Sequence, residues 1–223
     1  AMGGRETGSL SNLLPGHRQA DNLGHRAEVA DYWQVDALPD APGLTAVELF
    51  EAVAEGKIKA VWIACTNPAQ SLPDQNKVHA ALAACPFVVV QEAFFTTETC
   101  EFADLLLPAA SWGEKEGTQT NSERRISHVR RAVAAPGEAR ADWAITVDFA
   151  QRLQRQLRPG LPSLFDFSSP EALFEEYRQL TAGRDLDITG LSYALLDQQG
   201  PQQWPLPRGA KQGKSRLYAD GRF

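Results

Sequence analysis

The sequence predicts an α/β fold in which a mainly parallel, Rossmann-like wound sheet is flanked by helices. Three short apolar runs, 58–64 (IKAVWIA), 87–90 (FVVV) and 105–107 (LLL), are separated by segments with helical spacing. Short connections in the order helix, strand, helix, strand, helix, strand are typical of parallel strands joined by crossover helices. The first two runs are almost continuously apolar, which indicates strands buried on both faces.

The predicted helices have clear boundary signals. Thr45 and Glu48 fit a capping box, and Gly56 ends the helix that they begin. Asp74 is expected to cap a second helix, and a short helix over 97–103 precedes the third strand.

Beyond the third strand the pattern changes. Residues 110–141 are polar and rich in arginine, so we expect a long ordered excursion outside the core. Asp142 is expected to cap an amphipathic helix, and Ser169-Pro170-Glu171 opens another.

The chain divides into three expected parts. Glycine and proline interrupt residues 1–43, where only 26–33 has a helical pattern, so this is expected to be a segment truncated from a larger domain. Residues 44–199 form the predicted α/β domain. Residues 200–223 are rich in Pro, Gly, Gln and basic residues and are expected to be a linker toward a missing domain.

Composition limits the class of protein. The chain has 223 residues, 43% of them hydrophobic, and a net charge of −6, which argues against nucleic-acid binding. No apolar run approaches a membrane span. The spacing of Cys65, Cys85 and Cys100 fits neither a disulfide framework nor a metal site, so we expect reduced thiols packed as small apolar groups in a cytoplasmic protein.

Polar residues follow the first two predicted strands, where ligands bind in a wound parallel sheet. Residues 65–71 (CTNPAQS) follow the first strand, and Gln91-Glu92-Ala93 follows the second. Neither is a glycine-rich dinucleotide or P-loop motif. The residues alone leave two roles open for Glu92: accepting hydrogen bonds from a guanine edge or ribose hydroxyls, or capping the next helix.

The segment 112–121 (WGEKEGTQTN) is also dense in groups that bind phosphates or amides. Lys115 is either a solvated lysine with surface ion pairs or a ligand contact, and Arg124 and Arg125 are either a surface cluster or a phosphate clamp. His128 has no carboxylate or serine partner at a diagnostic spacing. The sequence therefore predicts no catalytic residue and no metal ligand in this chain.

Several of these motifs, taken in order, resemble the molybdopterin oxidoreductase superfamily. They are CTNPAQSLPD after a strand, the ungapped run from Thr97 to Arg125 with ADLLLP and EKEGT, and PGEARADWAITVDFA. Within the superfamily, the sequence is most similar to catalytic subunits of bacterial assimilatory nitrate reductases. The resemblance covers nearly the whole chain and implies a Rossmann-like third domain that helps bind molybdopterin guanine dinucleotide.

The resemblance also implies five cofactor-binding residues. Asn67 matches the asparagine of the first strand-end loop, and Gln91 and Glu92 match the pair at the second strand end. Related periplasmic enzymes have aspartate where Glu92 stands. Lys115 matches a lysine expected to meet pyrophosphate or pterin, and Asp142 matches the aspartate before the tryptophan-opened helix.

As a whole protein, the resemblance implies an enzyme that reduces nitrate to nitrite with a molybdenum-bis(molybdopterin guanine dinucleotide) cofactor. Its electrons are expected to come from a donor protein or subunit through a 4Fe-4S cluster in a missing N-terminal part. A missing barrel domain is expected to close over the cofactor, so this chain alone should be inactive. The alternatives are a sibling enzyme such as formate dehydrogenase, or a non-catalytic α/β module that binds a nucleotide or a protein partner.

Overall fold

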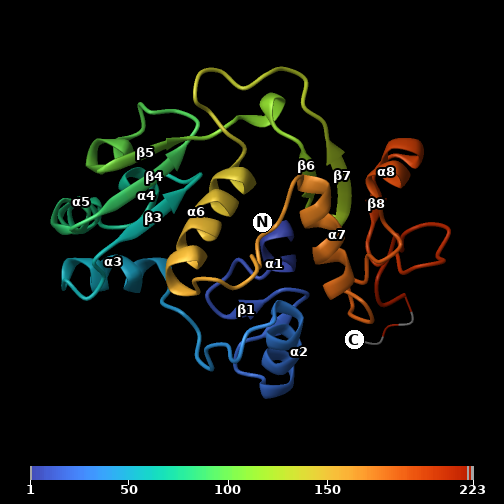
Figure 1. The fold of residues 1–223 in the computed structure, drawn as a ribbon. Coiled ribbons are helices and arrows are strands. Elements are labelled where there is room, and N and C mark those ends of the chain that lie inside the picture. Colours follow the sequence, from blue (N-terminus) through green and yellow to red (C-terminus); the bar gives the residue numbers. More distant parts are fainter. Residues whose placement is uncertain (1, 220, 222–223) are drawn as a thin grey trace. The chain divides into compact units, whose positions relative to one another are not determined.

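The computed structural model describes residues 2–219 and 221, which divide into two compact units. The parallel-sheet unit comprises 44–115 and 131–161. The antiparallel-sheet unit comprises the described residues of 1–43, 116–130 and 162–223. Figure 1 shows the order of the elements along the chain.

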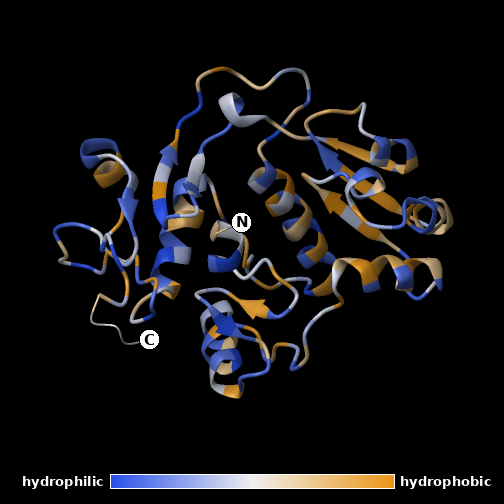
Figure 2. Ribbon diagram, turned by 180° about the vertical axis from the view of Figure 1, so that it is seen from behind, coloured by the Kyte–Doolittle hydropathy of each residue, from blue (hydrophilic) through white to orange (hydrophobic). Residues whose placement is uncertain are grey.

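A three-stranded parallel sheet forms the centre of the first unit. Its strand order is β3 (Val61–Ala64), β4 (Val88–Glu92), β5 (Leu105–Pro108), with Val61 opposite Val88 and Val89 opposite Leu105. Figure 2 shows these strands as largely hydrophobic. The predicted α/β fold with a parallel sheet is thus confirmed.

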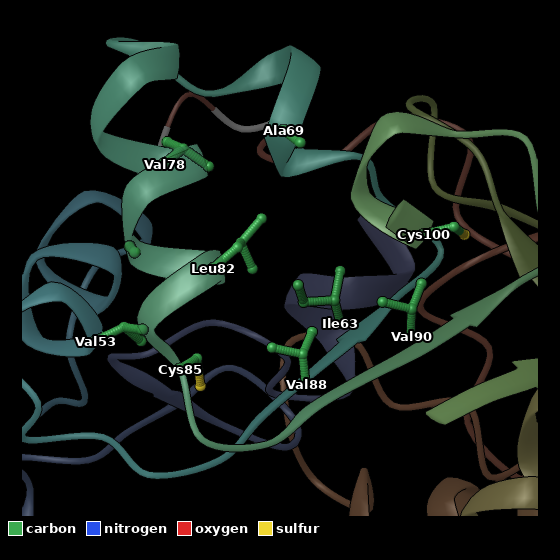
Figure 3. Close-up of a cluster of buried hydrophobic side chains, with 10 residues drawn as sticks. Val53, Ile63, Ala69, Val78, Leu82, Cys85, Val88, Val90 and Cys100 are labelled. Atoms are coloured by element: carbon green, nitrogen blue, oxygen red, sulfur yellow. The ribbon is translucent and has the colours of Figure 1, made fainter. Parts of the chain in front are cut away.

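Helices cover both faces of this sheet. They are α3 (Ala46–Ala54), α4 (Pro68–Ser71), α5 (Gln75–Ala84) and α6 (Asp142–Leu157), with 3₁₀ helices η1 (Glu98–Phe102) and η2 (Trp112–Glu114). On one face, Val78 and Leu82 of α5 converge on Ile63, Val88 and Val90 of the strands (Figure 3). On the other face, the rings of Trp62 on β3 and Phe149 on α6 meet edge to face at 4.9 Å.

Two expectations about this unit need correction. β4 is buried, but Val61 and Trp62 of β3 are only partly buried, because β3 is an edge strand of the sheet. Asp74 precedes α5 with a left-handed φ of 54°, and its carboxylate pairs with Lys77 at 3.0 Å while making no side-chain cap. The capping box of Thr45 and Glu48 is confirmed.

The second unit contains an antiparallel sheet of β6 (Gly117–Thr120), β7 (Arg125–Val129) and β8 (Gln202–Gln203). The prediction of an excursion without a core element over 110–141 was therefore wrong. β7 buries Ile126 and the His128 side chain on one face, and its intervening polar residues concealed this pattern.

The remaining elements of this unit are α1 (Met2–Glu6), β1 (Leu13–Leu14), β2 (Arg18–Gln19), α2 (Leu23–Trp33), α7 (Pro170–Leu180) and α8 (Tyr193–Gln199). Ser169 caps α7 by accepting a hydrogen bond from the Ala172 amide, as predicted. Residues near the beginning of the predicted linker, Trp204 and Leu206, are 3% and 1% exposed and belong to the core of this unit. The end of the predicted linker (220, 222 and 223) lies outside the described residues.

Candidate functional site

One carboxylate joins four segments of the parallel-sheet unit. Asp142 Oδ1 accepts hydrogen bonds from Gln91 Nε2 at 2.8 Å and from the Cys65 thiol at 3.3 Å. Its Oδ2 lies 2.6 Å from Lys115 Nζ in an ion pair. We call Cys65, Gln91, Lys115 and Asp142 the Asp142 cluster. It brings together three of the five predicted site residues.

The sheet positions this cluster at the carboxyl ends of its strands. Gln91 follows Val90 in β4 and is 3% exposed, with Ala64 and Leu107 as its neighbours across the sheet. Cys65 follows β3 directly, and its amide donates to the Gln91 carbonyl at 3.0 Å. The backbone hydrogen bonds of the sheet therefore fix the positions of Cys65 and Gln91 at this edge.

Asp142 is the first residue of α6, since the N-cap position is Ala141 and no side chain caps the helix. The prediction that Asp142 caps this helix was wrong, because its carboxylate oxygens accept hydrogen bonds from the side chains of Gln91, Cys65 and Lys115 and not from the helix backbone. Its charge still lies at the helix N-terminus, where the helix dipole stabilises an anion.

The surroundings shift two pKa values in the cluster. Partial burial acts to raise the pKa of Asp142, but hydrogen bonds from Lys115, Gln91 and Cys65 outweigh it, and the pKa is lowered. Burial, with the adjacent Asp142 charge, raises the pKa of the Cys65 thiol to about 11. Asp142 is thus an anion and Cys65 a neutral thiol donor at neutral pH.

Glu92 ends β4 beside the cluster but is not a member of it. Its Oε1 accepts hydrogen bonds from the Ala93 amide at 2.7 Å and the Phe94 amide at 3.4 Å. Those amides belong to the loop after β4, and η1 begins only at Glu98, so the helix-cap role for Glu92 was wrong. Within the described residues Glu92 Oε2 has no hydrogen-bond partner.

Asn67 lies in the loop after β3 and faces a different group of residues. Its Oδ1 accepts from the Thr99 amide at 3.2 Å and the Thr99 hydroxyl at 2.6 Å, and its Nδ2 donates to Glu98 at 2.6 Å. Asn67 thus ties this loop to η1, and no interaction with the Asp142 cluster is seen in the described structure.

A cavity of about 270 Å³ lies beyond the ends of β4 and β5. It is lined by residues that follow these strands, among them Ala93, Phe94, Ser111 and Glu114. Ala93, which lines the cavity, directly follows Glu92 in the sequence. None of the five predicted site residues lines it.

The arginines and histidine that the sequence left open belong to the antiparallel-sheet unit. Arg124 Nη2 donates to the carbonyls of Lys214 and Ser215 at 3.2 and 3.1 Å, and its guanidinium lies over the Trp204 ring. His128 Nδ1 lies 2.7 Å from Asp197. These contacts stabilise the unit, and Asp197 escaped detection because it lies 69 residues away in sequence.

Sequence reasoning missed Cys65. Packing as a small apolar group was predicted for all three cysteines and is confirmed for Cys85 and Cys100, which are buried, but Cys65 is exposed and is a hydrogen-bond donor. Its position directly after an apolar strand was the available signal. Across the residues that the structure describes, no group of three or more His, Cys, Asp or Glu is arranged to hold a metal ion.

The fold and the cluster define an α/β protein with polar and charged side chains at the carboxyl ends of its parallel strands, which is where ligands bind in folds of this class. Residues 3–152 match the molybdopterin oxidoreductase family, to which the chain belongs.

Relatives within the family include nitrate reductases. A nitrate reductase of Synechocystis sp. is 43% identical over 229 residues, covering 100% of this chain and 31% of the relative. The assimilatory nitrate reductase catalytic subunit of Bacillus subtilis is 38% identical, covering 98% and 30%. An F420-dependent formate dehydrogenase subunit alpha of Methanocaldococcus jannaschii is 36% identical, covering 98% and 30%. The chain spans less than a third of the length of each of these relatives.

A solved structure agrees at the level of the fold. Acetylene hydratase from Pelobacter acetylenicus superimposes with a TM-score of 0.55 at 24% identity, covering 72% of this chain and 21% of that one. None of the helices that could be described has both the length and the apolar character to cross a membrane.

Proposed function

We propose that this chain is the part of a molybdenum-dependent nitrate reductase that helps bind a molybdopterin guanine dinucleotide. Family membership, together with nitrate reductases at 38–43% identity across nearly the whole chain, carries the proposal. The whole protein would then be an enzyme that reduces nitrate to nitrite in the cytoplasm.

The chemistry of the strand-end side chains fits such a cofactor. Glu92 offers a carboxylate oxygen to the N1–H and amino group of a guanine, or to ribose hydroxyls. Among the residues that the structure describes, Lys115 makes one hydrogen bond, to Asp142, and so retains N–H donors for a phosphate. Gln91 and Asp142 complete this part of the proposed binding set, since Asp142 pairs with Lys115 and Gln91 donates to the same carboxylate. Asn67 belongs to the proposed set through the family resemblance, and its amide bonds to Thr99 and Glu98.

The bound cofactor supplies the redox chemistry, which this chain's residues do not perform. In this proposal the chain supplies cofactor binding, and further parts of the polypeptide supply a 4Fe-4S cluster and the path for electrons from a donor protein. This chain alone is then inactive. Reduced viologen should give no nitrite from nitrate when the 223-residue chain is assayed by itself.

The direct test uses the enzyme expressed from the complete gene. Molybdenum and iron contents are measured together with nitrite formation from nitrate. Molybdenum, iron and nitrite formation, all found together, would support the proposal. Metals with formate oxidation and no nitrate turnover would assign the chain to an enzyme like the formate dehydrogenase relative, and absence of molybdenum would reject the cofactor-binding role.

A further inference from the structure

A second, larger cavity lies within the antiparallel-sheet unit. It has a volume of about 540 Å³, which falls in the range of small-molecule sites. The end of α2, the segment 163–167 and α7 line it. The Tyr32 hydroxyl donates to the Glu176 backbone carbonyl at 2.6 Å and so ties α2 to α7 at the cavity wall.

Aromatic rings make up much of the lining. Tyr32 and Trp33 come from α2, and Phe165 and Phe167 come from the segment before α7. Trp33 remains 37% exposed, so the lining is open to a ligand from solvent. The negative faces of aromatic rings attract organic cations.

Two carboxylates, Asp166 and Glu176, line the same cavity. Neither makes a side-chain hydrogen bond or ion pair with any residue that the structure describes. The arginines of the two helices that line the cavity have other partners. Arg178 of α7 pairs with Glu175 and donates to the Thr189 carbonyl at 2.6 Å, and Arg26 of α2 donates to the Ala20 carbonyl at 2.8 Å. Within the described residues, neither arginine therefore pairs with Asp166 or Glu176, and the negative charge of the cavity is not neutralised by α2 or α7.

Asp166 and Glu176 are both exposed residues, but the carboxyl group of Glu176 is partly desolvated. Burial raises the pKa of Glu176. Burial, and next the Glu176 charge, raise the pKa of the Tyr32 hydroxyl, so this carboxylate and this ring act on each other. A bound cation would offset this partial desolvation, because it would pair with the Glu176 charge.

We propose that this cavity binds a small organic cation, an ammonium group with apolar substituents, between the aromatic rings and the two carboxylates. The site is separate from the proposed cofactor-binding residues, all of which belong to the parallel-sheet unit. The cation-binding proposal can therefore be tested independently of the nitrate reductase proposal.

The test compares cations with a neutral analogue of the same shape. Choline, Nα-acetyl-lysine N-methylamide and 3,3-dimethylbutan-1-ol are each titrated into the 223-residue chain, with the Trp33 indole NMR signal as the readout. We expect a cation to bind about tenfold or more tightly than the neutral alcohol. Preference for choline indicates a free small molecule as the ligand, and preference for the lysine amide indicates a protein side chain. Cation affinity no higher than that of the alcohol would overturn the proposal.

Variants locate the binding. Glu176→Gln and Asp166→Asn each remove one charge with little change in shape, and each should weaken cation binding about fivefold or more while leaving the alcohol unaffected. Glu171→Gln, in the first turn of α7 and outside the cavity lining, is the matched control and should bind as the wild type does. Because Asp166 is exposed in a loop, its variant should fold even if Glu176→Gln does not. Unchanged cation affinity in Asp166→Asn would reject the assigned site.

Discussion

Asp142 shows how a single side chain can organise a strand-end site. Gln91, Cys65 and Lys115 donate to its two oxygens from three different segments. Because the carboxylate is about one-third exposed, the ion pair with Lys115 is screened and adds little stability by itself. Its main consequence is to fix where the Lys115 ammonium lies.

The raised pKa of Cys65 makes this exposed thiol a slow nucleophile. With a pKa of about 11, thiolate is scarce at pH 8, and alkylation by iodoacetamide should be on the order of 100-fold slower than for an ordinary cysteine. Asp142→Asn removes the adjacent charge and should accelerate the reaction. Mass spectrometry of the Cys65 peptide over time measures both rates, with Asp148→Asn as the control. Equal rates in the wild type and Asp142→Asn would contradict this account.

The lowered pKa of Asp142 predicts a dependence of stability on acid pH. A carboxyl group whose pKa is lower in the folded state contributes stability that is complete above its unfolded pKa, about 3.9, and is lost as the pH falls through the folded value. In Asp142→Asn the loss of stability below about pH 4 should therefore be shallower. Urea unfolding followed between pH 2.5 and 6 measures this, and identical slopes in the two proteins would refute it.

At the scale of elements, helix α3 depends on its capping box. Thr45 Oγ1 accepts from the Glu48 amide at 3.4 Å, while the Thr45 amide donates to Glu48 at 2.8 Å. Thr45→Ala should lower the free energy of unfolding by about 1 kcal/mol, because the first turn loses its side-chain partner. Thr96→Ala, at an exposed loop position, should change it by less than about 0.5 kcal/mol. Urea unfolding compares the two, and equal effects would argue against the cap.

The face of the parallel sheet that α5 covers holds the core of its unit. Leu82 on α5 is 2% exposed, whereas Leu106 on the edge strand β5 is 44% exposed. Leu82→Ala should therefore cost about 2–5 kcal/mol, and Leu106→Ala less than half as much. Hydrogen exchange of the β4 amides measures both changes, and similar losses of protection would contradict this placement of the core.

The sequence predicts the parallel-sheet unit well because its strands and helices carry local signals. Apolar runs located β4 and β5, and a capping box located α3. It failed for β7, where the buried Ile126 and the largely covered side chain of His128 are separated by the polar Ser127 and preceded by Arg125. Such a strand is recognisable only once its partner strands are known.

The candidate site was also predictable where its signals are local in sequence, and not where they depend on distant residues. The sheet-edge argument and the family resemblance proposed Gln91, Lys115 and Asp142, and the structure brings these three together. Local sequence could not reveal the Cys65 contact with Asp142, because 77 residues separate the two. Nor could it reveal that Asn67 is committed to Thr99 and Glu98, since both lie more than 30 residues further along the chain.

For the whole molecule, family membership and the strand-end chemistry support one proposal, that this chain holds part of a molybdopterin cofactor in a nitrate reductase. The most direct measurement is the molybdenum content of the full-length enzyme carrying Glu92→Ala or Lys115→Ala, with Lys77→Ala as a control on the surface helix α5. The account predicts reduced molybdenum in the first two variants and wild-type content in the third. Full molybdenum occupancy in both Glu92→Ala and Lys115→Ala would contradict it.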